Sequence, residues 1–141
     1  MPKEIYQGDS YESLRPLFTL TFLDDGGAPL NLSGYTVRTT FKLQSTDPVN
    51  DPNDANAYIR HHIRIAADGS VIGNRGLQLR NVAADGILDQ YLSSEESGLL
   101  PVDQPLYSDV ELTSPLGEKI TWVYDDPLVV LPAYTNRTTD E

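Results

Sequence analysis

The segment 35–43 constrains the fold more than any other part of this 141-residue chain. One set of its side chains alternates strictly with a more polar set, and successive side chains of a strand point to opposite faces. A period of two therefore predicts a strand with one buried face. The first set is Tyr35, Val37, Thr39, Phe41 and Leu43, and the second is Thr36, Arg38, Thr40 and Lys42.

A second strand is predicted at 17–23, where Phe, Leu and Thr dominate. The two strands are separated by Asp24-Asp25-Gly26-Gly27, whose residue types tolerate a positive φ. Further strands are predicted at 58–65, 77–79, 86–92, 106–112, 119–124 and 128–131, with Asp68-Gly69 as a hairpin turn before Val71-Ile72. The expected core residues are Phe18, Leu20, Phe22, Val37, Phe41, Val110 and Leu112.

One short helix is predicted after residue 92. Ser93 is a favourable N-cap, and the acids that follow it suit the first turn of a helix. Gly98 and Pro101 limit this helix to one or two turns. Many short strands with little helix indicate an all-β sandwich or barrel. The chain length predicts one domain, which we divide into an N-terminal arm at 1–16, a sandwich at 17–131 and a polar tail at 132–141.

The composition argues against several classes of partner. A net charge of −11 opposes binding to nucleic acids and to anionic membranes, because both need clustered Lys and Arg. The chain has no Cys, no apolar run long enough to span a membrane, and no apolar stretch near Met1 that resembles a signal peptide. We therefore expect a protein that is made and used without export.

No sequence motif predicts catalysis. The chain has no G-x-S-x-G, no G-x-x-x-x-G-K and no H-E-x-x-H. The acidic pairs Asp24-Asp25 and Asp125-Asp126 could serve as acid and base, but turn formation is the favoured interpretation. We therefore expect no enzyme activity, no catalytic residue, no cofactor and no small-molecule substrate.

Metal binding is not predicted either. His61 and His62 are adjacent on a predicted strand, so they point to opposite faces and cannot share one metal. Asp47, Asp51 and Asp54 are the best candidates for calcium ligands. Their spacing departs from the EF-hand pattern and two prolines interrupt it, which favours a solvated loop over 44–57.

The order of segments resembles a known family. Q-G-D-S at 7–10 precedes a strand, followed by D-D-G-G-A-P-L-N-L-S-G-Y-T-V-R at 24–38. P-L-Y-S-D-V-E-L-T-S-P-L-G-E-K-I-T-W at 105–122 and D-P-L-V-V come later. This order resembles the immunoglobulin-like N-terminal domain of phage upper baseplate proteins and related tail or neck proteins. The resemblance implies an immunoglobulin-like antiparallel β-sandwich. The segments 44–57 and 71–92 are not part of it.

The resemblance implies a structural subunit of a phage virion, located in the tail, baseplate or neck and assembled in the host cytoplasm. Its expected partners are other virion proteins and further copies of itself in a ring or trimer. The polar ends and the long loop are expected to make the contacts, because they carry no core pattern of their own. The interface candidates are Ile5, Tyr6, Tyr11, Tyr58 and Tyr134.

The alternative function is a carbohydrate-binding or adhesive β-sandwich module. It would require exposed aromatic rings gathered on one face. Trp122 alternates within its predicted strand, which favours a core or sheet-face position over a sugar-stacking one. The other rings available are Tyr35, Tyr58, Tyr91, Tyr107 and Tyr124.

Overall fold

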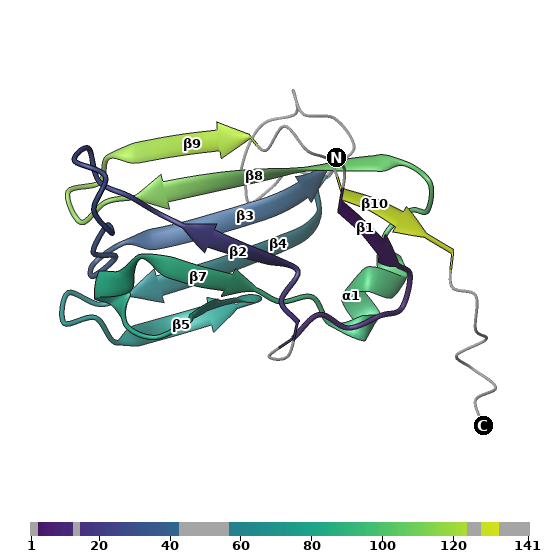
Figure 1. Cartoon of the computed structure of the whole chain (residues 1–141), viewed down its shortest axis with the longest axis horizontal. Helices are drawn as coiled ribbons and strands as arrows, with labels where there is room; N and C mark the ends of the chain where they lie inside the picture. Colours follow the sequence, from purple (N-terminus) through teal and green to yellow (C-terminus); the bar gives the residue numbers. More distant parts are fainter. Residues whose placement is uncertain (1–2, 13–14, 43–56, 124–127, 133–141) are drawn as a thin grey trace.

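The computed structural model describes residues 3–12, 15–42, 57–123 and 128–132, and the side chains of 57, 122 and 123 are excluded from that description. Within these ranges the chain is an all-β sandwich with one short α-helix (Figure 1). No helix in the described ranges is long and apolar enough to cross a membrane. Most of the predicted loop and of the polar tail lies outside the described residues. The same is true of several positions named above: Asp47, Asp51, Asp54, Tyr124, Asp125-Asp126 and Tyr134.

The larger sheet is built around β8 (Pro105–Thr113), which together with β4 is the longest of the described strands. One side of β8 pairs with β3 (Thr36–Lys42), which pairs with β4 (Ala57–Ile65), and β5 (Val71–Arg75) follows. The other side pairs with β10 (Leu128–Leu131) near its start and with β9 (Lys119–Val123) near its end. The smaller sheet has the order β2 (Phe18–Thr21), β7 (Ile87–Gln90) and β6 (Leu77–Leu79).

Two apolar clusters fill the space between the sheets. Six of the seven expected core residues are buried, and Phe18 is partly buried against both clusters. Phe41 belongs to the second cluster and its ring stacks on Phe18 with centroids 6.4 Å apart. The strands predicted at 17–23, 35–43, 106–112 and 119–124 all form, and their ends differ from the predicted ones by at most two residues. The period of two therefore identified the buried face correctly.

The predicted turns and the helix start are also present. Asp24 Oδ1 accepts hydrogen bonds from the backbone N–H groups of Gly26 and Ala28, at 2.9 and 3.0 Å. Asp68 Oδ1 likewise accepts from the N–H of Ser70 at 3.0 Å and closes the β4–β5 hairpin. A single turn of 3-10 helix at Ala83–Asp85 precedes β7. Both acidic turns thus satisfy backbone donors, as short polar side chains in turns do.

Helix α1 (Ser94–Leu99) begins with a capping box. The Ser93 hydroxyl accepts from the N–H of Glu96, and the Glu96 carboxylate accepts from the N–H of Ser93, each at 3.1 Å. This arrangement satisfies two donors at the start of the helix. Figure 1 shows α1 at one end of the sandwich, near β1 and β10.

We predicted that residues 1–16 form an arm outside the sandwich, and this prediction is wrong for part of that segment. Residues Lys3–Tyr6 form strand β1, which pairs in parallel with β10, so the sandwich is not wholly antiparallel. Ile5 is fully buried and Tyr11 nearly so, both in the second core cluster. The Ser97 hydroxyl donates to the carbonyl of Asp9 at 2.7 Å and accepts from the N–H of Gly8 at 2.9 Å. Residues 3–12 therefore pack on their own chain.

Candidate functional site

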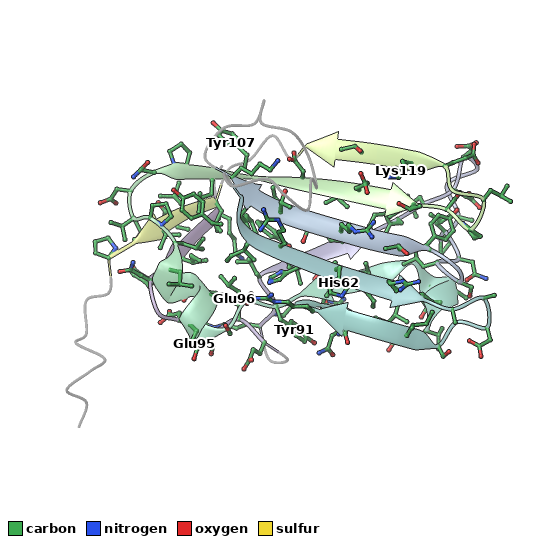
Figure 2. All side chains as sticks on the ribbon, turned by 180° about the vertical axis from the view of Figure 1, so that it is seen from behind. His62, Tyr91, Glu95, Glu96, Tyr107 and Lys119 are labelled. Atoms are coloured by element: carbon green, nitrogen blue, oxygen red, sulfur yellow. The ribbon has the colours of Figure 1, made fainter. Side chains whose placement is uncertain are left out.

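The outer face of the larger sheet carries a cavity of about 490 Å³. Figure 2 views the molecule from this side and labels His62 on β4 and Lys119 on β9. The cavity is rich in basic side chains although the whole chain is acidic. Four of the ten Lys and Arg residues line it, with two histidines and one carboxylate: Arg38, Arg60, Arg64, Lys119, His61, His62 and Glu111.

Strand register places these side chains in rows across the sheet. Paired residues in neighbouring strands lie on one face, so each row contains one residue per strand. One row runs from Arg64 through Thr36 and Thr113 to Lys119. The next runs from His62 through Arg38 to Glu111, and the third runs from Arg60 through Thr40 to the buried Asp109.

Three of the cations in these rows, Arg38, Arg64 and Lys119, are only weakly neutralised by other described side chains. Arg38 Nη1 lies 3.6 Å from Glu111 Oε1, a distance typical of a loose surface ion pair. For Arg64 and Lys119, no ion pair is found within the described ranges. Burial lowers the pKa of His62, and the positive charges of Arg38 and Arg75 lower it further. The lining of the cavity therefore contains more cationic than anionic side chains.

A second polar group lies on the opposite, inward face of β4. His61 is buried, and its Nε2 is 3.0 Å from Glu96 Oε2. Its Nδ1 is 3.1 Å from Gln90 Nε2, which also donates to the Thr39 hydroxyl at 3.1 Å. Both ring nitrogens of His61 therefore have a hydrogen-bond partner.

This inward group joins three elements. Burial raises the pKa of Glu96, but the hydrogen bonds from His61 and from the Ser93 N–H, with the charge of Arg75, outweigh burial and lower it to about 2. His61 belongs to β4, Glu96 to α1 and Gln90 to β7. Because the imidazole is fully shielded from solvent, we assign the group a structural role in holding the two sheets and the helix together.

The structure separates the interface candidates. Ile5 and Tyr11 are in the core, and Arg15 stacks over the Tyr11 ring with its Cζ 4.5 Å from the centroid. Tyr6 and Tyr58 are exposed on β1 and β4, which are separated in the sheet by β10, β8 and β3. Of the proposed aromatic platform, Tyr35 packs against the first core cluster and the Trp122 side chain is outside the described part.

His61 and His62 point to opposite faces, as the strand pattern predicts, and the ring nitrogens of His61 bond to Glu96 and Gln90 although both residues line the cavity. Among the described residues, no three His, Cys, Asp or Glu side chains are grouped in a way that could hold a metal ion. Sequence reasoning missed the basic cavity and the His61 group. The sequence shows Arg60, His62 and Arg64 at alternate positions of one strand. Which residues of the neighbouring strands lie beside them, among them Arg38 and Lys119, depends on the strand register.

The edge strand β9 is the third notable feature. In the described ranges β9 pairs with β8 alone, and no strand of the smaller sheet lies in front of it (Figure 1). Ile120 pairs with Leu112 and so shares its inward face, yet Leu112 is buried while Ile120 is 53% exposed. Leu116, in the turn before β9, is 87% exposed. Among the described residues, this edge of the sheet thus presents the apolar side chain of Ile120, with Leu116 in the turn beside it.

Comparison of the chain with protein-family models, curated proteins and solved structures finds no match.

Proposed function

We propose that this protein is a structural subunit of a phage virion and that it acts by protein–protein assembly through the edges of its larger sheet. The observation that carries the proposal is the half-exposed Ile120 on the inward face of β9. Large apolar side chains beside an unpaired edge are a liability unless a partner covers them. The order of sequence segments, which resembles that of phage baseplate and neck proteins, supplies the setting.

The opposite edge of the same sheet supports a repeating contact. Strand β5 ends the sheet on that side, and Val71 and Ile72 on it are exposed. Two different edges on one subunit allow head-to-tail contact, in which β9 of one copy lies against β5 of the next. Contacts of this kind close into a ring when the rotation between copies permits. The edges thus fit the ring expected from the resemblance.

The test compares particles produced with variant chains. Ile120→Lys and Ile72→Lys each place a charge on one edge, and both should reduce the amount of the chain in purified particles at least tenfold. Val82→Lys makes the same change at an exposed position outside the strands, next to the 3-10 turn, and should leave incorporation unchanged. All three positions are exposed, so unfolding should not account for a difference. Equal incorporation of all three variants would contradict assembly through the sheet edges.

A further inference from the structure

The basic cavity opens on the outer face of the sheet, whereas the contact just proposed runs along its edges, and Lys119 is the one cavity residue on the edge strand β9. We infer that the cavity bounded by Arg38, Arg60, Arg64 and Lys119 binds an extended acidic peptide segment of a partner protein. The inference goes beyond the proposed function. It concerns a different surface and can be tested on the isolated chain, so either proposal can fail while the other holds.

The spacing of the cations matches an extended peptide. Arg60 and Arg64 lie two residues on either side of His62 along β4, and all three side chains share one face. Two residues of a strand span about 6.8 Å, so the two arginines are roughly 14 Å apart. A single phosphate cannot contact both. Carboxylates at every second position of an extended peptide repeat at the same interval as this row.

Lys119 extends this group of positive charges across the sheet. It lies three strands from Arg64 in one row, a separation of about 14 Å, with the threonines of β3 and β8 between them. The cations are thus spread over a broad concave surface and do not converge on one point. Guanidinium groups at such spacing can each take a separate carboxylate.

The floor of the cavity contains a polar group that is available to a ligand. Thr40 lines the cavity and is only 2% exposed. Its hydroxyl has no hydrogen-bond partner within the described ranges. Because buried hydroxyls are nearly always hydrogen-bonded, this atom indicates a position where a peptide group of the ligand can bind.

Charge favours a short acidic peptide over a nucleic acid. The chain as a whole carries a charge of −11, so a long polyanion that extends beyond the cavity meets net repulsion. An acidic segment of a few residues fits within the cationic area. Short, locally complementary charges of this kind give specificity and faster association.

The experiment measures binding of synthetic peptides to the full chain by calorimetry at low salt. The first peptide has aspartate at every second position with threonine between, and the second has asparagine in place of every aspartate. We expect the first to bind and the second to bind at least tenfold more weakly. Inorganic phosphate and single-stranded DNA are tested in parallel. Tighter binding of either one than of the aspartate peptide would overturn the inference, as would no binding of that peptide.

Charge reversal localises the site. Arg64→Glu and Lys119→Glu should each weaken binding of the aspartate peptide at least tenfold. Lys3→Glu, which makes the same change of charge on the exposed face of β1, should change the affinity less than twofold. An equal loss in all three variants would show that only net charge matters and would refute the site. Melting curves of the variants verify that each is folded.

The unaltered protein provides an independent readout. His62 lies at the centre of the cavity, and the positive groups around it are Arg38, Arg75 and Arg64, with His61 on the other face. A bound carboxylate favours the imidazolium form, so the aspartate peptide should raise the pKa of His62 in an NMR titration. The asparagine peptide should leave the pKa of His62 unchanged. If the aspartate peptide binds without moving this titration, it binds elsewhere and the inference is wrong.

Discussion

Gly76 lies directly against the imidazole of His61, so that a Cβ added to this glycine would overlap the ring. The backbone there has φ of +76°, in the left-handed region. Its carbonyl accepts from the N–H of Tyr91 at 2.7 Å, and Gly76 also bridges to His62 on β4. Gly76 lies at the junction of β5 and β6, and its close approach to His61 on β4 thus depends on the missing side chain.

Gly76→Ala should therefore destabilise the protein by roughly 2–4 kcal/mol, which combines the left-handed backbone penalty with overpacking against His61. Gly117→Ala is the matched control, because Gly117 also has a positive φ of +87° but would meet nothing within 4 Å. It should lose only about 1 kcal/mol. Urea unfolding of both variants measures the difference. Equal losses of unfolding free energy would mean that the contact with His61 does not contribute to stability.

Phe41→Ala should cost about 3–5 kcal/mol, because the ring is fully buried and stacks on Phe18. Tyr58→Ala is the comparison: it removes a ring of similar size that is 43% exposed on the neighbouring strand, and should cost about 1 kcal/mol. Chemical denaturation distinguishes the two. A loss below about 1 kcal/mol for Phe41→Ala would contradict the assigned face of β3.

Ser93→Ala should destabilise the protein by about 1 kcal/mol, since the hydroxyl caps the Glu96 N–H at the start of α1. Ser94→Ala, one residue later and exposed, removes a hydroxyl of the same kind without removing the cap. It should change the free energy of unfolding by less than about 0.5 kcal/mol. If the two variants are equally stable, the capping box contributes nothing.

The stability of the fold should fall in acid partly through Glu96. Its pKa is about 2 in the folded protein and near 4.5 in the unfolded chain, so the unfolded chain takes up its proton first. The contribution of Glu96 is fully present above about pH 4.5 and is lost as the pH falls towards 2. Glu96→Gln should therefore show a smaller loss of unfolding free energy between pH 5 and pH 2.5 than the unaltered protein. Glu95→Gln, on the exposed side of α1, should follow the unaltered protein, and a match between the two variants would refute this role.

Local sequence pattern was enough to predict the helix start and the strands of both sheets except β1. Alternation in 35–43 and 106–112, turn residues such as Asp68, and the cap at Ser93 act over a few neighbouring residues. Strand β1 was missed because Lys3–Tyr6 is short, contributes the single core residue Ile5, and pairs with a strand about 125 residues away. No pattern in the neighbouring sequence indicates such a distant pairing.

The candidate sites could not be predicted for the same reason. The basic cavity needs Arg38, Arg64 and Lys119 to meet across β3, β4 and β9, which register decides. The buried group needs His61, Gln90 and Glu96 from three elements. The exposure of Ile120 arises because the smaller sheet does not extend over β9, a property of the packing of the two sheets rather than of the strand itself.

The absolute copy number of this chain in density-purified phage particles tests the central claim most directly. Quantitative mass spectrometry against an isotope-labelled standard, normalised to a capsid protein, gives that number. A subunit of a ring or trimer should be present at a fixed small number of copies per particle, and that number should be unchanged after a high-salt wash. Absence from the particles, or trace amounts that vary between preparations and wash away, would contradict a structural role in the virion.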